Sequence, residues 1–173
     1  PHGDRARAEP DGAEISPDES GAKLAYRCVM AAASPIPPNS RAPLILVVDD
    51  YSDTRDMYAE FLDYAGMRAE TAENGRAAVR RALRSHPAAI VMDLEMPVMD
   101  GWEATRILHT DPRTKDIPIV VLTGQAEPRL EERAKDCGAA CVLSKPCTPK
   151  ELLDVLRQVI DEAPKSSSTP FRR

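Results

Sequence analysis

Several short apolar runs in this chain stop abruptly at polar residues. The runs are LILVV at 44–48, AAIVM at 88–92, IVVL at 119–122 and CVL at 141–143. A run of this length that is apolar at every position and bounded by turn residues indicates a strand buried on both faces, as in a parallel sheet covered by helices. A weaker strand is predicted at 68–72, which gives the sheet five strands.

Between these strands, apolar residues recur at helical spacing and predict five helices. The first helix is expected to begin at Ser52 or Asp53, either of which can cap it, and to run through Ala65 until Gly66 closes it. Its inner stripe is predicted to consist of Met57, Phe61, Leu62 and Ala65.

The second helix is expected to open at Asn74-Gly75 and to end before Pro87. Its predicted buried stripe consists of Val79, Ala82, Leu83 and His86. The opposite face of the same helix is basic and contains no acid between its arginines. A solvated face is the preferred interpretation of that stripe, and an anion-docking surface for a partner is the alternative; it consists of Arg76, Arg80, Arg81 and Arg84.

Three more helices complete the alternation. They are expected at about 102–109, at about 128–137 and from Thr148 onward, where Thr148 and Glu151 form a capping box. Five strands alternating with five helices predict a doubly wound α/β fold, in which a parallel sheet with the strand order 2-1-3-4-5 is the middle layer of a three-layer sandwich.

Composition divides the chain into three parts. Residues 1–43 hold seven of the 16 prolines with mixed charges and few large apolar groups, so we expect a disordered arm or linker there. A short helical face near 24–32 is interpreted as a transient helix, with a docking helix for a partner or the remnant of an upstream domain as the alternative. Residues 44–163 contain all the predicted strands and helices, and 164–173 are expected to be a disordered tail.

Charge and cysteine content exclude several classes of protein. The 23 basic and 28 acidic residues give a net charge of −5, which argues against a general nucleic-acid binder. The four cysteines form no CxxC pair, so we expect reduced thiols in a cytoplasmic protein. No run approaches the ~20 apolar residues that a membrane span needs.

Reactive side chains follow the predicted strands at their carboxyl ends. Because the carboxyl ends of parallel strands lie along one edge of the sheet, three carboxylates, one hydroxyl and one ammonium group are expected to converge there, namely Asp49, Asp50, Asp93, Thr123 and Lys145. Crowded carboxylates repel each other by about one to four kcal/mol per close pair. A divalent cation relieves this repulsion, and Mg²⁺ suits a site with few carboxylates and room for phosphate oxygens.

Four motifs at these strand ends resemble the receiver domains of response regulators in two-component signal transduction, the CheY-like family. The motifs are VVDD at 47–50, VMDLEMPVMDG at 91–101, VLTG at 121–124 and SKP at 144–146. The resemblance covers residues 44–163 and implies the flavodoxin/CheY-like version of the fold. It also implies that Lys145-Pro146, an X-Pro bond, is often cis.

The resemblance implies a role for each residue of the cluster. Asp93 would be the phosphoacceptor, Thr123 the switch hydroxyl and Lys145 the phosphate-facing cation. The implied Mg²⁺ ligands are Asp49, Asp50, Asp93 and the backbone carbonyl of Glu95.

By the same resemblance, the protein is expected to be a phosphorylatable switch with slow self-dephosphorylation rather than a metabolic enzyme. The phosphoryl group would come from a sensor histidine kinase or a histidine phosphotransfer domain. A changed surface would then bind a target protein or a second copy through the fourth helix, the fifth strand and the fifth helix. No output module fits in the arm or tail, so a stand-alone receiver or a piece of a longer chain is expected.

One departure and two alternatives accompany this interpretation. The family commonly has Tyr or Phe three residues before the lysine, where this chain has Val142, so signalling by backbone or fourth-helix movement is the hypothesis. A phosphorylation-independent interaction module is the first alternative. The second is a haloacid-dehalogenase-like phosphohydrolase, which needs a second Asp where Glu95 stands.

Overall fold

A five-stranded parallel sheet forms the centre of the protein in the computed structural model, which describes residues 42–124 and 129–163. The strand order is β2-β1-β3-β4-β5, as predicted. All four strand pairings are parallel. The strands are β1 (Leu44–Val48), β2 (Arg68–Ala72), β3 (Ala89–Met92), β4 (Ile119–Thr123) and β5 (Cys141–Ser144).

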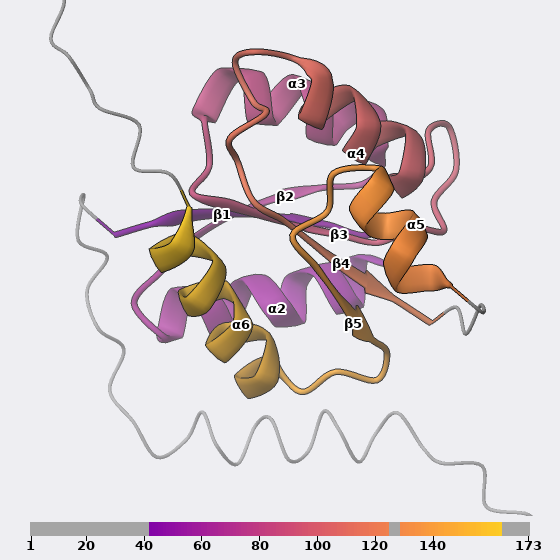
Figure 1. Cartoon of the computed structure of the whole chain (residues 1–173). Helices are drawn as coiled ribbons and strands as arrows, with labels where there is room; N and C mark the ends of the chain where they lie inside the picture. Colours follow the sequence, from indigo (N-terminus) through magenta and orange to yellow (C-terminus); the bar gives the residue numbers. More distant parts are fainter. Residues whose placement is uncertain (1–41, 125–128, 164–173) are drawn as a thin grey trace, which may run out of the picture. The chain divides into compact units, whose positions relative to one another are not determined.

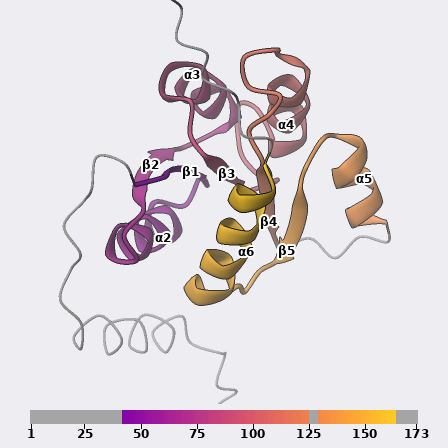
Figure 2. The same cartoon turned by 60° about the vertical axis from the view of Figure 1, so that its left-hand side comes forward.

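In the part of the chain that the structure describes, five helices alternate with these strands and cover both faces of the sheet. In Figure 1, α3 and α4 lie above the sheet, and α2 and α6 lie below it. The turned view in Figure 2 keeps the same two pairs on opposite sides. The helices are α2 (Ser52–Tyr64), α3 (Gly75–Ser85), α4 (Gly101–Thr110), α5 (Leu130–Asp136) and α6 (Pro149–Glu162). The predicted doubly wound fold class is therefore confirmed.

Alternate residues of each central strand face opposite helix layers, which builds a core on each side of the sheet. In β1, Ile45 and Val47 pack in the cluster that contains α2 and α6. Their neighbours Leu46 and Val48 pack in the cluster that contains α3 and α4. Because both faces are covered, β1, β3 and β4 need apolar residues at every position, and this requirement explains the continuous runs in the sequence.

Local capping signals were mostly interpreted correctly. The Asn74 side chain accepts from the Ala77 N–H at 2.9 Å and begins α3. The capping box of Thr148 and Glu151 opens α6. The predicted cap of the first helix was wrong, because Ser52 is already helical and the preceding Tyr51 makes no side-chain cap bond.

The predicted buried stripe of α3 was also partly wrong. His86 is exposed and ends the helix in a left-handed conformation with φ 43°. Val79 and Leu83 are only partly buried. The fully buried side chains are small, and these residues let α3 pack closely against the sheet and α4; they are Ala77, Ala78 and Ala82. A pattern search that weights large apolar residues underestimates such an alanine face.

The described part of the chain contains no helix with the length and apolar character of a membrane span. Its three cysteines are free thiols: Cys137, Cys141 and Cys147. The predictions for the arm, the tail and the start of the fourth helix at Pro128 fall outside the described residues.

Candidate functional site

Strand register brings the acids of β1 and β3 together at one edge of the sheet. Val48 pairs with Met92, and the Asp93 N–H donates to the Val48 carbonyl at 2.9 Å. Asp49 and Asp93, the next residue of each strand, therefore lie side by side. Both are largely buried, with 2% and 6% exposure.

Lys145 reaches the same place from the end of β5, the strand at the edge of the sheet. Thr123 pairs with Ser144, and the Lys145 N–H donates to the Thr123 carbonyl at 2.8 Å, so the lysine leaves the sheet edge beside the fully buried threonine. Its ammonium group donates to Asp49 Oδ2 at 2.7 Å and to Asp93 Oδ2 at 2.8 Å. One cation from the edge strand thus bonds carboxylates on two inner strands.

Backbone donors orient the other oxygens of these two carboxylates. Asp93 Oδ1 accepts from the Leu94 N–H at 2.7 Å and from the Glu95 N–H at 3.4 Å. Asp49 Oδ1 accepts from the Tyr51 N–H at 2.9 Å. Each carboxylate is therefore held between its own loop and Lys145, which fixes its orientation before any ligand binds.

Burial and charge act in opposite directions on the ionisation of this cluster. Burial raises the pKa of Asp93, and the neighbouring Asp49 raises it further, whereas the hydrogen bond and charge of Lys145 lower it; burial dominates. Burial alone lowers the pKa of Lys145, but the bonds to Asp49 and Asp93 outweigh it and raise that pKa above its usual range. The ammonium group is consequently held in its charged form beside the acids.

The third acid completes a set of oxygens that fits a divalent cation. Carboxylate oxygens of Asp49, Asp50 and Asp93 all lie within 4.8 Å of one another. Asp50 Oδ1 is buried and has no hydrogen-bond partner in the described structure. A buried carboxylate oxygen without a donor is costly, and an all-oxygen set of this kind is what Mg²⁺ prefers. The donor set therefore fits the ion that the sequence suggested.

The loop after Asp93 is closed by a glycine at the start of α4. The Gly101 N–H donates to the Leu94 carbonyl at 3.0 Å. A Cβ added at Gly101 would lie 2.0 Å from the Asp93 carbonyl oxygen. Only a residue without a side chain allows α4 to begin so close to the end of β3, and this contact places the Asp93 loop. Glu95, in the same loop, is exposed.

Tyr58 supports the lysine loop and was missed by the sequence reasoning. Its ring is 3% exposed, and its hydroxyl donates to the Cys147 carbonyl at 2.8 Å, two residues after Lys145. Burial raises the pKa of Tyr58, so the phenol stays protonated and keeps its donor. Tyr58 and Cys147 are 89 residues apart in the sequence. The available signal was Tyr58 itself, a tyrosine on the inner side of an amphipathic helix.

Comparison with known proteins gives a consistent assignment. The family model for the response regulator receiver domain matches residues 45–157. The phosphate regulon transcriptional regulatory protein PhoB of Pseudomonas aeruginosa is 35% identical over 128 residues, which are 73% of this chain and 56% of that protein. The matched regions amount to between 27% and 56% of the first three curated relatives.

Solved structures agree with the sequence matches. Chemotaxis protein CheY4 of Vibrio cholerae superposes with a TM-score of 0.65 at 35% identity and covers 68% of this chain and 98% of its own. The receiver domain of a sensor histidine kinase from Pseudomonas aeruginosa, solved with magnesium coordinated in its active site cleft, gives 0.64 at 32% identity, covering 69% and 98%. With the strand order, the acidic cluster and the family match in agreement, this chain belongs to the response regulator receiver domains of two-component systems.

Proposed function

We propose that Asp93 accepts a phosphoryl group from a phosphohistidine of a sensor histidine kinase or a histidine phosphotransfer domain. The observation that carries this proposal is the Lys145 ammonium group, bonded to both Asp49 and Asp93 beside an unsatisfied oxygen of Asp50. Phosphoryl transfer needs mainly an in-line nucleophile and neutralised charge, and this cluster supplies both. The receiver is the unit at residues 44–163.

Each residue of the cluster has a part in the proposed transfer. An Asp93 carboxylate oxygen forms the new bond to phosphorus while the bond from phosphorus to the histidine nitrogen breaks, and the imidazole leaves with those electrons. Lys145 neutralises charge that moves onto the phosphoryl oxygens. Thr123, buried at the end of β4, donates a hydrogen bond from its hydroxyl to a phosphoryl oxygen. Asp49, Asp50, Asp93 and the Glu95 carbonyl would hold Mg²⁺, which when bound neutralises phosphoryl charge.

The output of the switch is proposed to differ from the usual aromatic coupling. Val142 is partly buried and packs against the cluster that contains Leu130 and Ala134 rather than providing a ring that can turn inward. Movement of Thr123 toward the phosphoryl group would then be transmitted by the backbone and α5. The face of α5, β5 and α6 presents the result to a target or a second copy. Amide exchange with and without a phosphoryl mimic tests this, and unchanged protection from 127 to 142 contradicts it.

Incubation with acetyl phosphate and Mg²⁺, followed by intact-mass measurement, tests the phosphoacceptor proposal. We expect one added phosphoryl group on the wild type and none on Asp93→Asn. Asp56→Asn is the matched control, because Asp56 is exposed on α2. An unmodified wild type would indicate a phosphorylation-independent module. Steady turnover of a phosphomonoester would indicate a phosphohydrolase.

A further inference from the structure

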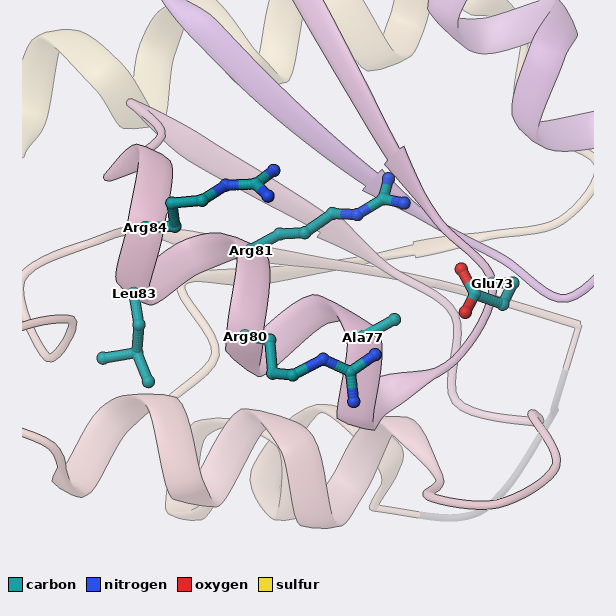
Figure 3. Close-up of a pocket in the computed structure, with 6 residues that line it drawn as sticks. All are labelled: Glu73, Ala77, Arg80, Arg81, Leu83 and Arg84. Atoms are coloured by element: carbon teal, nitrogen blue, oxygen red, sulfur yellow. The ribbon is translucent and has the colours of Figure 1, made fainter.

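The arginine face of α3 encloses a hollow on a part of the surface that the acidic site does not use. The hollow has a volume of about 560 Å³. We call it the arginine hollow, and it is lined by Glu73, Ala77, Arg80, Arg81, Leu83 and Arg84. In Figure 3, the side chains of Arg80, Arg81 and Arg84 all extend from the helix in the direction of Glu73.

The protein itself compensates little of this positive charge. α3 contains no acidic residue. Arg84 makes one long ion pair, 4.0 Å from its guanidinium to Glu70 Oε2. Within the described residues no ion pair joins Arg80 or Arg81 to an acid. Like charges at i and i+4, as at Arg80 and Arg84, cost a helix about 0.2–0.5 kcal/mol, so the face is not explained by helix stability.

The helix dipole does not explain the arginines either. A cation in the last turn gains from the dipole, and this accounts for Arg84. Arg80 and Arg81 lie in the middle of the helix, where that interaction has faded. Arg81 is partly buried and lines the hollow.

The chemistry of the lining selects the kind of partner. Planar guanidinium groups bind carboxylates through paired hydrogen bonds, and the partly buried Leu83 adds an apolar side chain to the lining. Glu73 lines the hollow and Glu70 lies next to Arg84. These acids, with the net charge of −5, oppose a continuous phosphate backbone. Separate carboxylates beside an apolar side chain match the lining better.

We propose that the arginine hollow on α3 binds an acidic segment of a partner protein. Carboxylates of that segment pair with Arg80, Arg81 and Arg84, and an apolar side chain covers the partly buried Leu83. α3 contributes none of Asp49, Asp50, Asp93, Thr123 or Lys145, so this proposal does not depend on phosphorylation. The partner would be held at a second surface, separate from the acidic cluster.

Fluorescence anisotropy with defined probes tests the proposal on the full chain. The probe is a fluorescein-labelled helical peptide with a Leu at position i and Glu residues at i+3 and i+4. A second peptide, the Gln twin, has Gln in place of every Glu. Binding of the Glu peptide is expected to weaken at least about tenfold in Arg80→Glu/Arg81→Glu. It is also expected to weaken as ionic strength rises from about 0.05 to 0.3 M. Arg106→Glu, an exposed position on α4, is the matched control and should bind normally.

Three results would overturn the proposal: no binding by the wild type, equal binding of the Gln twin, or a charge reversal without effect. Tighter binding of a single-stranded oligothymidylate would also overturn it and assign the hollow to nucleic acid. The neutral variant Arg80→Gln/Arg81→Gln guards against misfolding and should also lose affinity. Circular dichroism and normal Asp93 labelling by acetyl phosphate check that both variants are folded, and this labelling separates failure here from failure of the phosphoacceptor proposal.

Discussion

Lys145 determines the electrostatics of the acidic cluster because its two partners have been removed from water. Asp49 and Asp93 are nearly inaccessible, and both accept from the same ammonium group at under 3 Å. Removing one member of a buried ion pair leaves an uncompensated charge, which is more costly than the pair itself is stabilising. The cluster therefore needs Lys145 to stay in place. Its position depends in turn on the contacts that fix the loop that follows it.

Tyr58 is the residue that we expect to fix that loop. In Tyr58→Phe the Cys147 carbonyl loses its donor, and the free energy of unfolding should fall by about 1 kcal/mol. The rate of Asp93 labelling by acetyl phosphate should fall as well, because Lys145 is less well placed. Urea unfolding and time-resolved intact mass measure the two effects. Tyr64→Phe, which removes the hydroxyl of a less buried tyrosine on the same helix, should change neither.

The same phenol gives a pH dependence. Burial raises the pKa of Tyr58 in the folded state, so its stabilising contribution is fully present below the pKa of an unfolded tyrosine, near 10. That contribution is lost as pH rises toward the folded value. Wild type should therefore lose stability above about pH 10 more steeply than Tyr58→Phe. Equal slopes in urea titrations at several alkaline pH values would contradict this.

At the scale of elements, the junction between β3 and α4 is the tightest part of the site. Gly101→Ala would force a Cβ against the Asp93 carbonyl and the Leu94 Cα, which are backbone atoms that cannot rotate away. We expect a loss of about 1–3 kcal/mol in stability, with slower labelling of Asp93. Gly124→Ala is the control, because a Cβ there meets nothing within 4 Å. Equal thermal midpoints of the two variants would contradict the prediction.

A cation–π interaction contributes to the contact between α4 and α5. The Arg133 guanidinium lies 4.2 Å from the centre of the Trp102 ring. An interaction of this kind at an exposed position stabilises by about 0.5–1 kcal/mol. Arg133→Gln should lower the free energy of unfolding by that amount and change the fluorescence of Trp102, the only tryptophan. Lys135→Gln, also exposed on α5, should do neither.

Sequence patterns predicted the elements well because the signals were local. The apolar runs of β1, β3 and β4 follow from burial on two faces, and the caps at Asn74 and Thr148 depend on residues three positions away. The errors on α3 came from tertiary context. Small residues replaced large ones on the buried face of α3, and His86 ended that helix in the left-handed region.

The acidic cluster could be predicted in place but not in detail. Strand ends and parallel topology were sufficient to bring Asp49, Asp50, Asp93 and Lys145 to one edge. The supporting contacts could not be predicted in this way, since the bond from Tyr58 to Cys147 joins distant parts of the chain and no local pattern reports it. The chemical roles of the cluster stay predictions until labelling tests them.

At the scale of the whole molecule, the crowded acids lower the stability of the metal-free protein and provide its affinity for a divalent cation. In Asp50→Asn one like charge leaves the cluster, so without divalent cation the variant should be more stable than the wild type by about 1 kcal/mol. Saturating Mg²⁺ should raise the thermal midpoint of the wild type. At a Mg²⁺ concentration one hundred times the dissociation constant, the free energy of unfolding should rise by about 2.7 kcal/mol. The rise should be smaller in the variant.

Calorimetric or fluorescence melting with and without Mg²⁺ measures both effects. Asp56→Asn, at an exposed position outside the cluster, should behave like the wild type. A variant that is less stable without the ion, or that gains as much from it as the wild type, would show that the three carboxylates do not share a cation.

The route by which Lys145 crosses from the edge of the sheet has a consequence for biosynthesis. Because the chain leaves the ribosome from its N-terminus, residues 49, 50 and 93 emerge well before residue 145. A nascent chain, or a fragment that stops short of β5, therefore carries the negative charges without the group that neutralises them. The hydrogen bonds from Lys145 to Asp49 and Asp93 can form only when the last strand has docked, so the acidic cluster is completed by the last part of the sheet to be synthesised.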